Sequence, residues 1–495
     1  MKRILIDVHP SSTKVCIVKD SLLEEFWVER KNINKLVGNI YKGKVMNVLP
    51  GMQAAFVNIG LERNAFLYAG DIVIDGEKLE GAEQLRINLK AGDNVLCQVE
   101  KDQFGTKGAR ITTNITLPGR VLVYMPQIDY VGVSHKITDE KTKERLVKIA
   151  SEIKPEGCGV ILRTQAQFCD EDELRAEMKE LVALWEKIKA DTLKKPAGTL
   201  VYKEQDLAIR AVRDMLADVD EVVINDEKLY NEFKRSFPYV EKMRPDIFKF
   251  YNGAKDLLQF YDLAEQIDAL LKRKVVLKNG AYLIIDRTEA LTVIDVNTGK
   301  FVGNKNLEET VFETNKIAAV EIARQLRLRN IGGIVVIDFI DMEEPSHREK
   351  VLEVLGAELE KDRVKTSLVG LTALGLVELT RKKTRSMIET VMLQPCPYCG
   401  GDGYVYGDEH MIMKIRSAIT QVFEGVSAKA VVVTVAPSLF NKMFSLRYLE
   451  KKCQTVWKDK RIYVIPDASM HIEKYKIQSL NSAILDLPDN ARMLY

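Results

Sequence analysis

The chain has 495 residues and a formal net charge of +2, which excludes a strongly basic or acidic molecule, so any basic surface must be local. Its seven cysteines are mostly isolated along the chain, a pattern that is unlike a disulfide framework and favours a reducing cytoplasm. We expect a cytoplasmic protein of several domains, because no segment has the pattern of a signal peptide or the apolar length needed to cross a bilayer.

The first part of the chain divides into four segments. Residues 1–35 read as strands in RILIDV, TKVCIVKD and LLEEFWVER. Residues 36–118 contain short strands at hairpin spacing, with turn signals such as LPGM, GLER and KAGD, which predicts a small barrel. Residues 119–207 combine strands with the amphipathic helix DEDELRAEMKELVALWEKIKA, and residues 208–271 contain strands and helices again.

The remainder of the chain alternates strands with helices. Residues 272–391 read strand, strand, helix, strand, helix, which indicates an α/β core. Residues 392–406 form a short cysteine-containing segment, and residues 407–495 read as a small final α/β unit. The sequence therefore predicts a multidomain protein with α/β and α+β parts.

The expected barrel carries residues that suit single-stranded RNA. Phe56 and Phe66 lie in or beside its strands, and Lys101 and Lys107 come from its last part. Aromatic rings stack on bases, at roughly 1–3 kcal/mol each, while lysines follow the phosphates. The alternative is that both phenylalanines belong to the core and both lysines are solvated, although the turn in AAFVNIGLERNAF places Phe66 just after an exposed loop.

Acidic residues follow apolar runs in LTVIDVNTG and GGIVVIDFIDM. Asp295 and Asn297 can share a strand face because side chains alternate, and Asp338 ends the second run, with Asp341 soon after. If the two strands are neighbours, Asp295 and Asp338 converge, and two carboxylates with open positions suit Mg²⁺ and the oxygens of a phosphate. The alternative is two strand-end acids that cap turns or helices. A histidine general base has little support, because His347 is the one histidine in this stretch.

Cys396 and Cys399 in LQPCPYCGGDGY have the pattern of a zinc knuckle, with a proline after the first cysteine and two glycines after the second. Structural zinc takes four ligands, and this segment supplies two. His410 offers one more, and Cys453 lies in an expected helix of the next unit. The simplest completion is the same pair from a second subunit, around a two-fold axis. A redox pair or two unligated thiols are the alternatives.

Together these motifs resemble the ribonuclease E/G family of endoribonucleases. GNIYKGKV, PGMQAAFVNIG, RTEALTVIDVNTG, IARQLRLRNIGGIVVIDFIDM and CPYCGG occur in the family's order and near its spacings, over nearly the whole chain. The resemblance implies an S1-type oligonucleotide-binding barrel in residues 36–118, a 5′-monophosphate sensor domain in 119–207 and a DNase I-like catalytic subdomain in 272–391. It also implies an RNase H-like domain assembled from residues 1–35 and 208–271, and the chain resembles the family's shorter members.

The resemblance assigns roles to single positions in the catalytic and RNA-binding parts. Asp295 and Asp338 match the family's two magnesium-binding carboxylates, and Asn297 matches an asparagine that helps to hold the site. The positions that match RNA-binding residues of the S1 domain are Phe56, Phe66, Lys101 and Lys107.

The resemblance also implies a pocket for the RNA's 5′-monophosphate, formed by Arg163, Thr164, Gly119, Val123 and Lys365. A guanidinium fork and a hydroxyl suit a terminal phosphate. The chain departs from the family in QAQF after the Arg-Thr pair, and in Lys365, which is a point charge where the family has an arginine. We expect these departures to change the geometry and selectivity of phosphate binding.

We therefore expect an Mg²⁺-dependent endoribonuclease that hydrolyses single-stranded, A/U-rich RNA in RNA processing and decay and is stimulated by a 5′-monophosphate. The resemblance implies that Zn²⁺ is shared between Cys396 and Cys399 of two subunits, in a homodimer that can pair into a tetramer. The alternatives are a non-catalytic S1-type RNA-binding or ribosome-associated factor, and a DNA nuclease with the same metal chemistry. A pure binding protein has no reason to place two carboxylates where phosphate must come.

Overall fold

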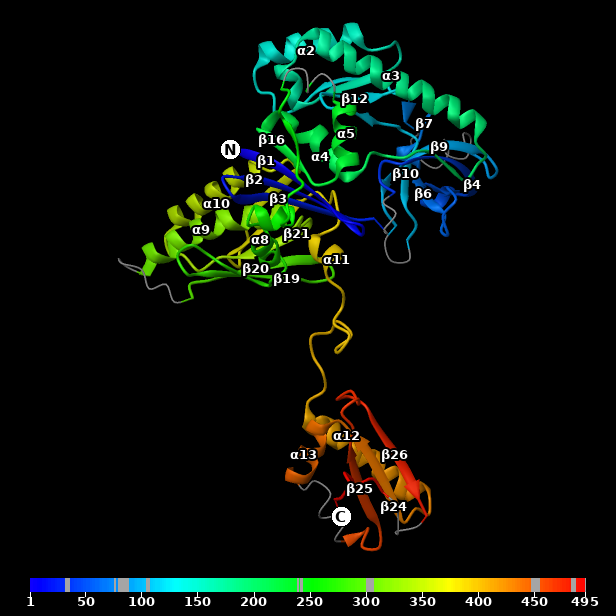
Figure 1. Ribbon diagram of the computed structural model, residues 1–495, viewed down its shortest axis with the longest axis vertical. Helices are drawn as coiled ribbons and strands as arrows, with labels where there is room; N and C mark the ends of the chain where they lie inside the picture. The colour runs from blue at the N-terminus through cyan, green and yellow to red at the C-terminus, as the bar shows by residue number, and fades with distance from the viewer. Residues whose placement is uncertain are drawn as a thin grey trace. The chain divides into compact units, whose positions relative to one another are not determined.

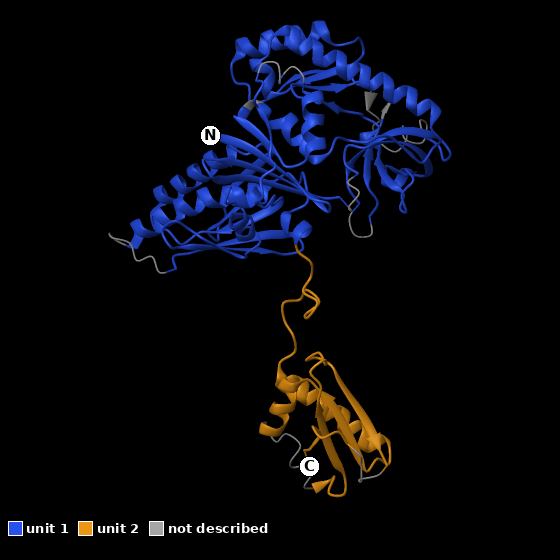
Figure 2. Cartoon of the chain, viewed as in Figure 1, with its two compact units in different colours: residues 1–392 blue, residues 393–495 orange. Residues whose placement is uncertain are grey.

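The structure is a computed structural model that describes residues 1–31, 36–74, 77–78, 89–103, 107–237, 240, 244–299, 307–446, 455–481 and 487–494. The chain divides into two compact units, an N-terminal unit of residues 1–392 and a C-terminal unit of residues 393–495 (Figures 1 and 2). Within these described ranges, none of the helices has the length and apolar character needed to span a membrane.

The first sheet of the N-terminal unit has the order β17-β16-β1-β2-β3 and joins two segments that are far apart in the sequence. β1 pairs antiparallel with β2 and parallel with β16. Ile4 and Ile6 pack under α4 and α5, while Leu5 packs on the other side with α7 and α8, so both faces are covered. The elements are β1 (Lys2–Val8), β2 (Ser12–Lys19), β3 (Leu22–Arg30), α4 (Leu207–Met215), β16 (Glu221–Ile224), α5 (Glu227–Ser236), β17 (Phe248–Phe250), α7 (Leu257–Phe260) and α8 (Ala264–Ala269).

The second sheet is the predicted barrel. Five strands follow one another in the order β4-β5-β6-β10-β9, and pairing of β9 with β4 closes the ring. Ala55 and Val57 point into the barrel core, so Phe56 between them points outward. A sixth strand, β15, comes from outside the expected barrel segment and pairs with β4. The strands are β4 (Ile40–Leu49), β5 (Ala54–Asn58), β6 (Ala65–Tyr68), β9 (Asn94–Lys101), β10 (Arg110–Thr112) and β15 (Thr199–Tyr202), with β7 (Val73–Ile74) and β8 (Glu77–Lys78) as a separate small pair.

The third sheet has the order β11-β12-β14-β13 and packs against two helices. α3 begins with a capping box, in which Asp170 accepts from the Glu173 N–H and Glu173 accepts from the Asp170 N–H. α2, which the sequence analysis did not single out, begins at an Asp139 cap. The elements are β11 (Leu117–Pro118), β12 (Leu122–Met125), β13 (Val131–Val133), α2 (Glu140–Ile153), β14 (Gly159–Leu162) and α3 (Glu171–Lys194).

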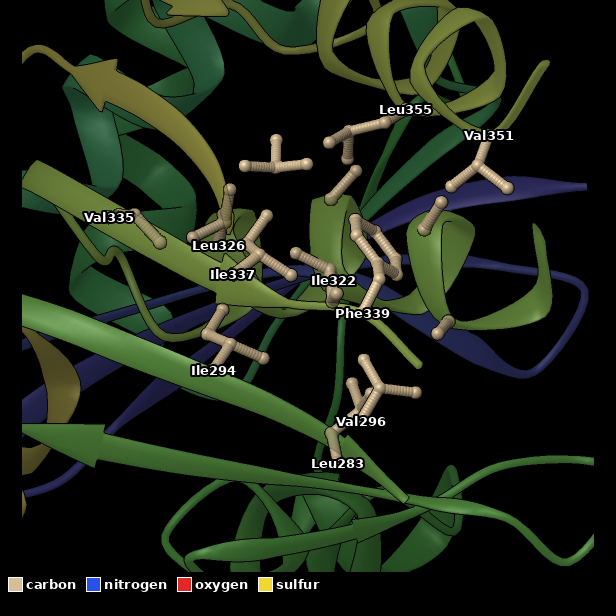
Figure 3. Packing of buried hydrophobic residues seen from close by; sticks show 14 of the residues in the cluster. Leu283, Ile294, Val296, Ile322, Leu326, Val335, Ile337, Phe339, Val351 and Leu355 are labelled. Carbon is tan, nitrogen blue, oxygen red and sulfur yellow. The ribbon is translucent and has the colours of Figure 1, made fainter. Parts of the chain in front are cut away.

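The fourth sheet has the order β18-β19-β20-β21-β23-β22, and α9 and α10 cover one of its faces. Ile294 and Ile337 point from β20 and β21 toward Ile322 and Leu326 of α9 (Figure 3). The hairpin β22–β23 follows α10 and was not predicted. The elements are β18 (Lys274–Val276), β19 (Tyr282–Arg287), β20 (Leu291–Asn297), α9 (Leu307–Leu328), β21 (Gly333–Asp338), α10 (Pro345–Glu360), β22 (Thr366–Leu371), β23 (Leu376–Arg381) and α11 (Ile388–Met392).

The C-terminal unit is a small α/β fold. β24 pairs parallel with β25 and antiparallel with β26, and α12 and α13 contribute to the apolar core beside them. The cysteine-containing segment precedes α12 in this unit. The elements are α12 (Asp408–Gly425), β24 (Ala430–Val435), α13 (Pro437–Leu446), β25 (Arg461–Pro466), β26 (Tyr475–Leu480) and β27 (Arg492–Met493).

Candidate active site and nucleic-acid interface

Asp295 and Asp338 lie side by side on the fourth sheet. β20 and β21 are parallel neighbours, and their register pairs Asp295 with Asp338. Ile294 and Ile337 point into the core, so alternation turns both carboxylates to the opposite face, where they are exposed. The same face carries Ile334, which is 49% exposed, so it is not covered by packed helices. The two carboxylates are therefore accessible to a large substrate.

The immediate contacts of the two carboxylates are polar and acidic. Asn297 Nδ2 donates a hydrogen bond of 2.7 Å to Asp295 Oδ2, because the two side chains share a strand face. Partial burial and the negative charges of Asp295 and Asp341 raise the pKa of Asp338 above its ordinary value. A bound cation would relieve this repulsion. The described residues contain no cluster of three or more His, Cys, Asp or Glu that could hold a metal, so a cation here needs further ligands from water or phosphate.

The segment that follows Asp338 is fastened to the start of α9. Glu308 accepts hydrogen bonds from the main-chain N–H groups of Glu343 and Glu344 and lies 2.8 Å from His347 Nδ1. The His347 ring stacks on Phe312 at 4.1 Å between centroids. One ring nitrogen of His347 thus lies against Glu308, and the contact with Phe312 fixes the plane of the ring.

A row of five side chains runs around the outside of the barrel. The registers pair Asn47 with Phe56, Phe56 with Phe66, Phe66 with Arg110 and Arg110 with Lys101, across all five strands. The two phenylalanine rings are half-buried and meet edge to face, with centroids 6.0 Å apart. They are therefore not core residues, and each keeps an exposed part beside basic side chains. We call this set the barrel row.

Arg110 and Asn47 are members of the barrel row that sequence reasoning missed. Arg110 donates from Nε and Nη2 to Asp71 Oδ2, at 3.0 and 2.6 Å, and its Nε lies 3.2 Å from Glu100. These carboxylates hold the guanidinium between Phe66 and Lys101. Lys107 is exposed and lies three positions before Arg110. The alternation of β10 could have revealed Arg110, because Ala109 and Ile111 beside it are apolar.

Arg163 and Thr164 follow β14 directly, and each is hydrogen-bonded. Arg163 Nη1 donates to the main-chain oxygen of Gly119 and to Asp214 Oδ1, both at 2.7 Å. The hydroxyl oxygens of Thr164 and Ser134 are 2.9 Å apart. Arg163 thus lies in an ion pair with Asp214, but 30% of its side chain remains exposed.

Gly119 contacts Arg163 through its main-chain oxygen, whereas Val123 pairs with Ile161, two positions before Arg163. A Cβ at Gly119 would stand 2.1 Å from Glu177 Oε1, which accepts from the main-chain N–H groups of Val121 and Leu122, so glycine leaves room for this carboxylate. Lys365 is exposed, and no ion pair links its ammonium group to any described residue. Arg363 instead reaches this region, with Nη1 donating to the main-chain oxygen of Asp214 at 2.9 Å.

Main-chain N–H groups surround the two thiols of the Cys396–Cys399 turn. Main-chain N–H groups of Cys399 and Tyr398 lower the pKa of the Cys396 thiol, and Gly403 donates its N–H to Cys399 Sγ at 3.2 Å. Gly400 and Gly401 have φ values of +67° and +105°, which other residues rarely adopt.

Among the described residues, His410 is the other candidate zinc ligand, and it does not contact the two cysteines. His410 stacks on Tyr406, with ring centroids 4.9 Å apart. Cys453 lies outside the described residues. The two thiols, both free, are therefore the zinc ligands that the described residues offer.

Comparison with known proteins identifies the family. Residues 116–384 match the model of the Ribonuclease E/G family. Ribonuclease G of Escherichia coli (strain K12) is 43% identical over 88% of this chain and 91% of the relative. Ribonuclease G of Haemophilus influenzae is 41% identical over 88% and 90%, whereas Ribonuclease E of Nostoc is 40% identical over 74% of this chain and 54% of its own length. The chain therefore belongs to the Ribonuclease E/G family.

Proposed function

We propose that this protein is an endoribonuclease of RNA processing and decay that hydrolyses single-stranded RNA with the help of Mg²⁺. The observation that carries the proposal is the register of Asp295 with Asp338 on an exposed sheet face, in a chain of this family. The relatives' name, ribonuclease, supports RNA as the substrate. We further propose a preference for A/U-rich sites and products with a 5′-phosphate and a 3′-hydroxyl, which rest on the family resemblance.

Each residue of the proposed active site has a distinct role. Asp295 and Asp338 would hold Mg²⁺, which would activate water and stabilise the charge on the phosphodiester. Asn297 orients the Asp295 carboxylate through its 2.7 Å hydrogen bond. Glu308, through its contacts with the Glu343 N–H and with His347, ties the segment after Asp338 to the start of α9.

The barrel row is the proposed binding surface for the RNA strand. Exposed parts of Phe56 and Phe66 stack on bases, and Lys101, Lys107 and Arg110 attract phosphates. Because the residues of the barrel row are register partners across five neighbouring β-strands, they give the RNA a continuous path. Arg163 and Thr164, with Gly119, Val123 and Lys365, form the proposed site for the 5′-monophosphate that stimulates cleavage. All five positions are given by the family resemblance.

We propose a domain division and a shared zinc site on the same basis. Zn²⁺ would be held by Cys396 and Cys399 of two subunits, which would make the protein a homodimer that can pair into a tetramer. The proposed domains are RNase H-like (1–35 with 208–271), S1 (36–118), 5′-sensor (119–207), DNase I-like (272–391), zinc link (392–406) and C-terminal oligomerisation domain (407–495).

One experiment separates this function from its rivals. The purified protein is incubated with labelled single-stranded RNA, structured RNA and single-stranded DNA, each with Mg²⁺ and with EDTA. We expect internal cleavage of the single-stranded RNA when Mg²⁺ is present and no cleavage of it in EDTA. Binding of RNA without cleavage would favour a non-catalytic RNA-binding factor, and cleavage of DNA at a similar rate would favour a general nuclease.

A further inference from the structure

Asp214 joins three separate segments of the N-terminal unit. Its carboxylate accepts from Arg163 Nη1 at 2.7 Å and from Arg213 Nε at 3.3 Å, and its main-chain oxygen accepts from Arg363 Nη1 at 2.9 Å. Arg163 belongs to the proposed 5′-phosphate site, and Arg363 lies three positions before β22 of the fourth sheet. Asp214 therefore touches both the phosphate-binding arginine and the approach to the catalytic sheet.

The contacts of Arg163 leave one edge of its guanidinium for a ligand. Nη1 carries two hydrogens, and its two acceptors are Gly119 O and Asp214 Oδ1. Nε and Nη2 have no acceptor among the described residues, and together they form the edge that binds an oxyanion through two parallel hydrogen bonds. Asp214 thus holds the guanidinium in an orientation that presents this edge to a phosphate.

The contact with Arg363 has its own physical cause. Asp214 lies in the last turn of α4, where main-chain oxygens lack helical partners and the helix dipole is negative. The Arg363 guanidinium satisfies such an oxygen, and it also donates to Asp218 Oδ2 at 2.5 Å and lies 3.8 Å from Glu25 Oε1. The end of α4 and the segment before β22 are therefore bound to each other by charge and by hydrogen bonds.

The segment that starts at Arg363 leads to the carboxylates. β22 pairs with β23, and β23 pairs with β21 so that Leu376 lies opposite Asp338. Burial alone would raise the pKa of Asp214, but Arg163 and Arg213 hold it below its ordinary value, so the carboxylate is charged. A phosphate on the free edge of Arg163 adds a second anion to a guanidinium that Asp214 already contacts through Nη1, which weakens the attraction between Arg163 and Asp214 at the end of α4, where Arg363 is also bound.

We propose that Asp214 is a positioning residue that couples the 5′-phosphate site to the catalytic sheet, through Arg163 on one side and Arg363 on the other. This inference rests on the proposed stimulation by a 5′-monophosphate. Tighter binding of 5′-monophosphate RNA than of 5′-hydroxyl RNA requires that Asp214 holds Arg163. Faster cleavage of the 5′-monophosphate RNA requires Arg363 as well.

The test uses one oligoribonucleotide with a 5′-monophosphate and its 5′-hydroxyl twin. The ratio of kcat/KM for the two substrates gives the rate preference, and the ratio of Kd values, measured by anisotropy in EDTA, gives the binding preference. We expect Asp214→Ala to lower both ratios at least about fivefold, within the usual range of coupling between sites. Arg363→Gln lowers the rate preference by a similar factor and leaves the binding preference unchanged. Arg363→Lys retains the positive charge and therefore keeps part of the rate preference.

Three further variants make the result specific. Asp214→Asn is nearly isosteric and keeps an oxygen acceptor, so it folds and lowers both ratios less than Asp214→Ala does. The double variant Asp214→Ala with Arg363→Gln has a rate preference no lower than Asp214→Ala alone, because both act in one chain of contacts. The matched control is Asp129→Asn, which removes an exposed carboxylate paired with Lys154. Both residues lie in the segment 119–207 that also contains Arg163, and this variant leaves both ratios unchanged.

The outcomes separate this inference from the function on which it rests. Equal rates of the wild type on the two substrates would overturn the proposed 5′ stimulation, and the coupling with it. A wild type that prefers the monophosphate, together with an Arg363→Gln variant of unchanged rate preference, would overturn the coupling alone. Additive effects in the double variant would show that Asp214 and Arg363 act independently, which also overturns it.

Discussion

Two carboxylates in register on adjacent strands repel one another, and this repulsion adds to partial burial in raising the pKa of Asp338. Such an arrangement contributes nothing to the fold, because neither carboxylate has a cationic partner among the described contacts. Its cost is tolerable because both groups face solvent. A pair of acids that is costly for stability and open to substrate is the expected signature of a metal-assisted active site.

The roles of Asp295 and Asp338 can be tested by removing one charge at a time. We expect Asp338→Asn or Asp295→Asn to abolish RNA cleavage in Mg²⁺, because one remaining carboxylate is a poor ligand for the metal. RNA affinity should stay near that of the wild type, and Tm should be equal or higher, because a repulsion is removed. Cleavage assays, anisotropy and thermal melts measure the three quantities.

Glu378→Gln is the matched control for this pair. Glu378 is an exposed carboxylate on β23, opposite Val336, which lies two positions before Asp338 on the same strand. Its removal changes the charge of the sheet by the same amount, and cleavage should continue at near the wild-type rate. If Asp338→Asn cleaved as fast as this control, the assignment of the metal site would be wrong.

Arg163 is expected to control the response to the RNA's 5′ end. Arg163→Ala removes the guanidinium edge that faces a phosphate, so the preference for a 5′-monophosphate over a 5′-hydroxyl should fall more than cleavage of the hydroxyl substrate does. The control is Arg175→Ala, which removes an exposed arginine paired with Glu171 on α3. An unchanged preference in Arg163→Ala would place the phosphate site elsewhere.

Some residues of these sites could be predicted from the sequence and others could not. Asp295 and Asp338 each end an apolar run, and Phe66 follows a turn, so local pattern marks them. Asp214 lies 51 positions after Arg163 in a helix with no unusual feature, and its role exists only because tertiary packing brings the two together. The family resemblance places Lys365 where the family has an arginine. In the structure it is Arg363, two positions earlier, that contacts Asp214.

At the scale of elements, the spacing of apolar residues predicted helices and strands where a segment was long or was bounded by clear turn residues. α3 and α9 were predicted from their apolar spacing, and the capping box at Asp170 supports the start of α3. α2 was missed because charged residues fill half of its 14 positions. β15 was missed as a barrel strand because it has four residues and its pairing with β4 depends on tertiary contacts.

The barrel row predicts how RNA affinity is distributed over the strands of the barrel. Phe56→Ala and Phe66→Ala should each weaken single-stranded RNA binding by about 1–3 kcal/mol, because each removes a stacking surface. Lys101→Ala should weaken binding less and reduce its dependence on salt, because it removes one phosphate contact. Anisotropy titrations at several salt concentrations measure both effects.

Tyr130→Ala is the control for the two phenylalanines, because Tyr130 is an exposed aromatic residue, 52% accessible, outside the barrel. It should not change RNA affinity. If Phe56→Ala and Phe66→Ala bound RNA as tightly as Tyr130→Ala, the two rings would serve only the packing of the barrel surface.

At the scale of the whole molecule, the chain assembles its parts from segments that are distant in sequence. β1 pairs with β16, so that Arg3 lies opposite Glu221, and no local pattern could predict this pairing. Only the family resemblance implied that residues 1–35 and 208–271 belong together. Cys396 and Cys399 likewise depend on contacts that no local pattern predicts, because a structural zinc ion needs two ligands in addition to these thiols.

The last prediction concerns that assembly. If Cys396 and Cys399 of two subunits share one Zn²⁺, the purified protein should contain about half an equivalent of zinc per chain and sediment as a dimer or tetramer. Cys396→Ser with Cys399→Ser should lose this zinc and dissociate more readily, with activity falling as the assembly is diluted. Cys158→Ser is the control, because Cys158 is a free thiol in the N-terminal unit. A stable monomer with one full equivalent of zinc would show that each chain closes its own site.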